Sequence, residues 1–139
     1  MPAPHVSPAL WQAITEAAGA SLLTPGGQRN FLVGEGGETH IDVFTGAERA
    51  TRVRLPRRAF EQTLGYLASN GHLDRPNAVE VKANQDPERA GPLCRAARQR
   101  PDGSFGARVV TYVLPILEFC DVVGINRTAL PSVAWLEPS

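Results

Sequence analysis

The chain has little of what marks disulfide-rich, metal-binding or membrane proteins. Its two cysteines, Cys94 and Cys120, stand in no CxxC spacing, and its three histidines are scattered, so we expect no disulfide, metal site or cofactor. It has no run of about twenty apolar residues. The segment 1–5 also lacks the basic start and apolar centre of a signal peptide. These absences predict a cytoplasmic protein without membrane contact.

Net charge is also lacking, because fourteen basic side chains balance fourteen acidic ones. The charges are nevertheless segregated. Residues 1–48 carry one basic group against five acidic ones, whereas residues 49–108 carry twelve basic groups against six acidic ones. Lysine is nearly absent, and Lys82 is the only one. Arginine has a planar fork of donors that suits phosphates and guanine edges, so the middle segment predicts contact with nucleic acid.

A length of 139 residues and a hydrophobic content of 42% are sufficient for one core. We expect a single domain over 1–139, with an α/β part over 1–85 and a second part over 86–139. Residue periodicity predicts a helix over 8–19, a hairpin formed by 31–33 and 39–45, and a strand over 49–55 with arginines on its open face. A helix from Pro56 to the Asn70-Gly71 stop and a short strand around 79–81 follow. The fold class is therefore α+β with a small antiparallel sheet.

The pattern of the second part is helix, turn, helix and hairpin. We expect a short helix over 92–100, a turn at 101–103 and an amphipathic helix over 106–121. Pro115 should kink that helix or delay its start, and we expect a kink. Strands over 122–125 and 132–136 complete the pattern. The string 112–118 followed by 122–125 resembles the winged-helix superfamily, and this resemblance implies a recognition helix in the major groove and a wing on the DNA backbone.

The whole chain also resembles the small winged-helix modules that read methylated DNA in modification-dependent restriction systems. The resemblance rests on the turn at 24–27, the hairpin, the Leu-Pro-Arg-Arg-Ala-Phe string at 55–60 and the Leu-Pro-Ile-Leu string at 114–117. It implies sequence- or modification-selective binding of double-stranded DNA, with 5-methylcytosine as the preferred modification, and association with the nucleoid. A methyl reader needs an apolar surface beside the base. Phe105, Tyr112 and Trp135 are the candidates, and we expect Phe105 to be displayed and the other two to pack in the core.

These considerations give thirteen candidate DNA-binding residues. Residues at the front of the recognition helix would read base edges: Ser104, Phe105, Arg108, Thr111 and Tyr112. Arginines in the sheet, the helices and the wing would contact phosphates: Arg52, Arg54, Arg57, Arg58, Arg95, Arg98, Arg100 and Arg127. A solvated surface position is an equal alternative for each arginine taken singly, so the prediction depends on their joint placement.

Two other classes of function stay open. Asp42 on one expected strand and Glu80 with Lys82 on another match the D…ExK pattern of restriction-endonuclease-like nucleases. In that pattern two carboxylates hold a divalent metal and the lysine orients the attacking water. A protein-interaction module that uses its wing to bind a partner is the third class. We favour the DNA-binding interpretation, in which the protein is not an enzyme and has no catalytic residue.

Overall fold

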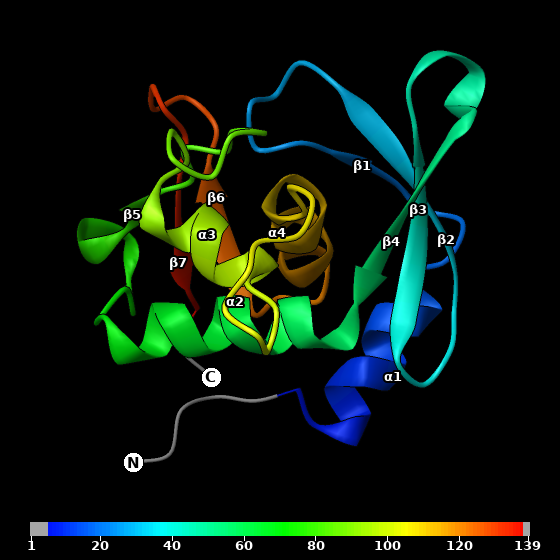
Figure 1. Ribbon diagram of the computed structural model, residues 1–139, viewed down its shortest axis with the longest axis horizontal. Helices are drawn as coiled ribbons and strands as arrows, with labels where there is room; N and C mark the ends of the chain where they lie inside the picture. The colour runs from blue at the N-terminus through cyan, green and yellow to red at the C-terminus, as the bar shows by residue number, and fades with distance from the viewer. Residues whose placement is uncertain (1–5, 138–139) are drawn as a thin grey trace.

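In a computed structural model of the chain, which describes residues 6–137, two antiparallel sheets lie on either side of a central helix (Figure 1). The first sheet has the order β1-β2-β3-β4 and the second the order β5-β7-β6. The α+β class with small antiparallel sheet structure is thus confirmed, and the strands are divided between two sheets. The sequence pattern shows which segments are strands, whereas their partition into two sheets depends on long-range packing.

The first half of the chain builds the four-stranded sheet. Helix α1 (Pro8–Glu16) begins as its sequence predicts, because the Ser7 hydroxyl accepts from the Leu10 N–H and Pro8 occupies the first turn. Strands β2 (Asn30–Gly36) and β3 (His40–Thr45) form the expected hairpin, and β4 (Thr51–Pro56) pairs with β3. The short β1 (Ser21–Leu23), which pairs with β2, was not expected from its three residues.

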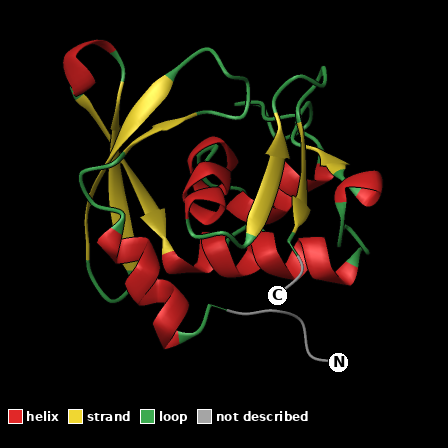
Figure 2. Ribbon diagram, turned by 180° about the vertical axis from the view of Figure 1, so that it is seen from behind, coloured by secondary structure: helices red, strands yellow, loops and turns green. Residues whose placement is uncertain are grey.

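Helix α2 (Arg57–Ser69) runs beneath both sheets (Figure 2). It buries Phe60, Leu64 and Leu67 as its helical spacing predicts, and it ends at Asn70, after which Gly71 adopts a φ of 75°. A 3₁₀ turn, η2 (Arg75–Asn77), leads to strand β5 (Val79–Glu80). Another 3₁₀ turn, η1 (Ala47–Arg49), connects β3 to β4.

The second half consists of helices α3 (Pro92–Arg98) and α4 (Val110–Phe119) and strands β6 (Val123–Asn126) and β7 (Val133–Leu136). Strands β6 and β7 form the expected hairpin, and β5 adds to β7. Helix α4 starts later than predicted, at Val110, and keeps Pro115 inside. The later start has a visible cause: the Gly106 N–H donates to the Arg98 carbonyl, and Gln99 forms a bridge with Phe105, so this backbone is committed to an extended pairing.

Helix α4 is the centre of the core. Seven of its ten residues are buried. It lies between the four-stranded sheet and the three-stranded sheet, as both views show. One hydrophobic cluster includes Phe31 and Ile41 of the first sheet, Leu64 of α2, and Leu114 and Leu117 of α4. No helix in residues 6–137 has the length and apolar character that crossing a bilayer requires.

Candidate nucleic-acid interface

Five segments that are distant in the sequence meet around a cleft of about 670 Å³. They are the β1–β2 turn at 24–29, the end of β3 at Thr45, the exit of β5 at 81–83, the approach to α4 at 108–112, and the β6–β7 loop at 127–132. In Figure 1 the β1–β2 turn and the β6–β7 loop lie at the same end of the molecule. The N-terminal end of α4 is thus the part of that helix that opens on a cleft.

The lining of this cleft is cationic. Arg29, Lys82, Arg108 and Arg127 contribute to it, and no acidic residue does. Within residues 6–137, Arg29, Lys82 and Arg108 have no carboxylate within ion-pair distance, whereas Arg127 pairs with Glu118. Three cations without acidic partners therefore face one concave surface, which is an arrangement that attracts anions.

Arg108 in the cleft lining has a hydrogen-bond donor that the described residues leave without an acceptor. Its Nε atom is buried and, among the described residues, has no hydrogen-bond partner. A buried donor without a partner costs about 1–3 kcal/mol, and such groups in folded proteins call for a specific explanation, such as a water or a bound ion. Arg108 lines the cleft, so its guanidinium lies near any anion bound there.

Lys82 lies in the cleft at the cost of backbone strain. Its φ is 39°, a region that residues other than glycine seldom adopt. The Lys82 carbonyl accepts from the Gly91 N–H at 3.0 Å, and this bond fixes the exit of β5. The side chain is exposed and lines the cleft, so it is accessible to a ligand there.

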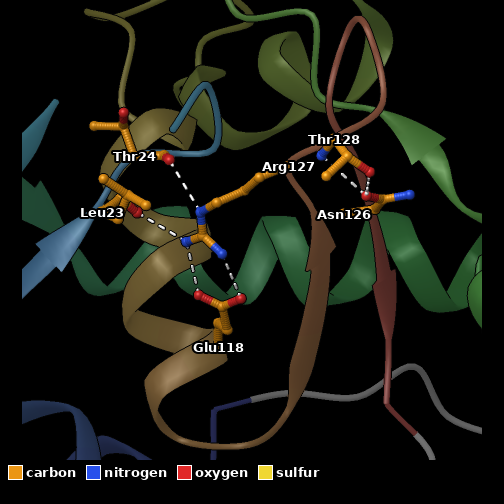
Figure 3. A network of polar contacts seen from close by, with 6 residues as sticks. All are labelled: Leu23, Thr24, Glu118, Asn126, Arg127 and Thr128. Carbon is orange, nitrogen blue, oxygen red and sulfur yellow. Dashed lines mark hydrogen bonds and ion pairs between the residues drawn. The ribbon is translucent and has the colours of Figure 1, made fainter. Parts of the chain in front are cut away.

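Arg127 was expected near the tip of the wing with its guanidinium on phosphate, and this expectation needs correction. It follows β6 directly and points toward α4 and the β1–β2 turn (Figure 3). Its guanidinium forms a bidentate pair with Glu118, with both distances 2.8 Å, and donates to the carbonyls of Leu23 and Thr24 at 2.9 and 3.2 Å. Glu118 neutralises the charge of Arg127, and four of the five guanidinium donors are used within the protein. Arg127 therefore connects α4 to the β1–β2 turn at the cleft.

Arg98 was also expected at the surface, and this is wrong. The residue is 5% exposed, and its guanidinium donates to the carbonyls of Gly106, Asn84 and Gln85 at 2.9, 2.6 and 2.7 Å. The helical pattern had placed it on the outer face of α3. The loops on either side of the helix fold over that face and supply the acceptors, so Arg98 connects three segments of backbone.

Two further arginines are largely committed to protein contacts. Arg54 pairs with Asp42 across β3 and β4 at 3.0 Å, and this contact lowers the pKa of the Asp42 carboxyl. Arg57 donates to the Val6 carbonyl at 2.9 Å and lies over the Trp11 ring. Both arginines therefore contribute less free positive charge than the sequence suggests.

The remaining candidates are distributed between the cleft and other surfaces. Thr111 and Tyr112 line the cleft together with Arg108, although Tyr112 is only 9% exposed and packs edge-on against Phe31. Trp135 is buried as expected, and Phe105 is 39% exposed, in a separate hollow beside Arg95. The other expected residues lie outside the cleft lining, and of them Arg58 is half-buried and the rest are exposed: Arg52, Arg58, Arg100 and Ser104.

Arg29 was not among the expected DNA-binding residues. It lies in an acidic stretch of sequence, so averaging charge over that stretch hides it. A local signal was present, because Arg29 follows the Thr-Pro-Gly-Gly turn at 24–27 directly after Gln28. The sequence assigns Lys82 only to a D…ExK pattern, and not to a DNA-binding surface.

The two carboxylates of the D…ExK pattern are divided between the two sheets. Asp42 is on β3 of the four-stranded sheet, and Glu80 is on β5 of the other sheet. The metal-binding arrangement requires the two carboxylates to converge on one ion. Asp42 instead accepts from Arg54, and no cluster of three or more His, Cys, Asp or Glu residues in 6–137 could hold a metal ion.

The fold and the cleft together define an α+β protein with a cationic cleft between two antiparallel sheets. Comparison with protein-family profiles, with curated proteins and with solved structures finds no match to this chain.

Proposed function

We propose that this protein binds double-stranded DNA through the cationic cleft. The observation that carries the proposal is the convergence of Arg29, Lys82 and Arg108 on a cleft without acidic lining residues. Phosphates are the anions that DNA presents, and arginine and lysine are their usual partners.

The order of elements supports a winged helix-turn-helix within this proposal. Helix α2, strand β5, helices α3 and α4, and the β6–β7 hairpin follow one another, and β5 pairs beside the hairpin. In such proteins the N-terminal residues of the second helix contact base edges. Here the flanks of α4 are covered by the four-stranded sheet and α2, so its N-terminal end, with Arg108 and Thr111, would carry the contact.

The proposal is tested by the equilibrium affinity for a panel of fluorescent duplexes. Replacing Arg108 or Lys82 with glutamine should weaken binding about ten-fold or more each, because a hydrogen bond to a charged group contributes about 1.5–3 kcal/mol. Arg89→Gln is the matched control. Arg89 has an 80% exposed side chain and lies outside the cleft, so this variant should bind like the wild type.

Two results would contradict the proposal. The first is a wild-type protein that binds no duplex at low salt. The second is a set of cleft variants that bind as tightly as Arg89→Gln, which would place the contact on another surface.

Selectivity for 5-methylcytosine is the finer level of the same proposal. Tyr112 offers an apolar edge in the cleft, and Phe105 is displayed in the loop before α4; either could contact a methyl group. The test compares each duplex with and without 5-methylcytosine. Tighter binding of the methylated form is expected. Equal affinity in every sequence context would exclude selectivity for 5-methylcytosine and would leave the proposal of DNA binding unaffected.

A further inference from the structure

The cleft has more volume than contact with a phosphate backbone requires. Its volume of about 670 Å³ falls in the range of about 300–1,000 Å³ that holds small organic ligands. A duplex backbone is convex and needs only cations on an open surface. A concave site of this size indicates a ligand that enters it.

The chemistry of the walls fits one nucleotide. Arg29, Lys82 and Arg108 supply positive charge for a phosphate. Pro25 and Tyr112 add a small apolar surface to the lining, because both residues are largely buried. The hydroxyl groups of Thr45, Thr111 and Ser132 also line the cleft, and each can both donate to and accept from the edge of a base.

Leu130 lies at the rim of the same cleft. It is 97% exposed, the highest value among the large hydrophobic residues that are described. It belongs to the β6–β7 loop. The beginning of this loop is fixed by the contacts of Arg127 and by the side-chain oxygen of Asn126, which accepts from the N–H and the hydroxyl of Thr128 (Figure 3). Leucine is among the apolar side chains that enter a base stack as wedges.

We infer that the cleft receives one nucleotide turned out of the duplex and that Leu130 fills the space it leaves in the stack. The inference rests on the proposed DNA binding. The phosphate of the extruded nucleotide lies against Arg29, Lys82 and Arg108, and the edge of its base meets the hydroxyl groups of Thr45, Thr111 and Ser132. Unpairing a base costs a few kcal/mol, and the cost is least where the pair is already mismatched.

The experiment uses the duplex that binds best in the panel, in a fully paired form and with a single mismatch. The affinity for the mismatched duplex should be at least about ten-fold higher than for the paired one. A saving of about 1.4 kcal/mol in the free energy of unpairing corresponds to a ten-fold change in affinity. A 2-aminopurine placed at the mismatched position reports unstacking through its fluorescence. This fluorescence should rise on saturation with wild-type protein.

Leu130→Ala separates the wedge from the phosphate contacts. This variant should narrow the preference for the mismatch and reduce the rise in 2-aminopurine fluorescence. The matched control is Leu73→Ala, because Leu73 is 50% exposed but lies outside the cleft; it should leave both readouts unchanged.

Equal affinity for paired and mismatched duplexes, with unchanged fluorescence at saturation, would overturn the inference while duplex binding stands. Wild-type behaviour of Leu130→Ala would exclude the wedge. Absence of binding to every duplex would overturn the proposed function and this inference together.

Discussion

Some arginines of this chain stabilise the fold and others line the cleft, and composition does not distinguish the two. Arg98 and Arg108 are ten positions apart in the same basic segment, yet one is buried against three carbonyls and the other faces the cleft. The difference comes from the loops that fold around α3. Helical periodicity assigns a side chain to a face of its own helix, but it does not indicate which loops will cover that face.

Arg98→Met should strongly destabilise the fold. The variant removes the donors of three carbonyls, and each unsatisfied group costs about 1–3 kcal/mol. Urea denaturation should therefore show a free energy of unfolding that is lower by about 3 kcal/mol or more. Arg95→Met on the same helix is the control, because Arg95 is exposed and should change stability by less than about 0.5 kcal/mol. Similar midpoints for the two variants would show that Arg98 is dispensable.

The contact between Asp42 and Arg54 predicts a response to pH. The hydrogen bond from Arg54 holds the pKa of Asp42 below its ordinary value in the folded state. The stability that this contact contributes is therefore present above the pKa of the unfolded state, near 4, and is lost as the pH falls through the lower folded pKa. Asp42→Asn should make the free energy of unfolding depend less on pH below about 4. A variant that follows the wild-type acid profile would contradict this.

At the level of elements, local sequence patterns predict most of the fold. Caps, alternation and turn residues indicate α1, the β2–β3 hairpin, β4, α2 and the β6–β7 hairpin, because each of these signals acts within a few residues. The assembly of the cleft does not follow from such signals. It brings together Arg29, Lys82 and Arg108, which are far apart in the chain and meet only through the packing of two sheets on α4.

Gly124 of β6 tests the packing of that hairpin. A Cβ atom there would overlap the ring of Trp135 on β7, so Gly124→Ala should destabilise the protein by about 1–3 kcal/mol, as overpacking does. Gly65→Ala in α2 is the matched control. It meets nothing within 4 Å and should stabilise the helix by about 0.5–1 kcal/mol. Thermal unfolding of the two variants should therefore shift in opposite directions. A melting temperature of Gly124→Ala equal to or above that of the wild type would show that β6 can move away from Trp135.

At the level of the whole molecule, a net charge of zero conceals an uneven distribution of free cations. Arginines that pair with Asp42, Glu61, Asp86 or Glu118 are partly or fully neutralised. The three cleft cations have no acidic partner among the described residues, and neither have several arginines outside the cleft, such as Arg52 and Arg100. The dependence of DNA affinity on salt measures how many cations displace counterions. It therefore separates binding by the cleft alone from binding by the entire basic segment.

Binding by the cleft alone should give a slope of log affinity against log salt of about −3, from a contribution of about −0.9 for each of three phosphate contacts. Arg108→Gln should make this slope less steep by about one unit, and Arg52→Gln on the outer face of β4 should not change it. A wild-type slope twice as steep, reduced by Arg52→Gln as well, would show that the arginines of the sheet share the DNA surface. A slope of zero would exclude phosphate contacts, and with them the cleft as a DNA site.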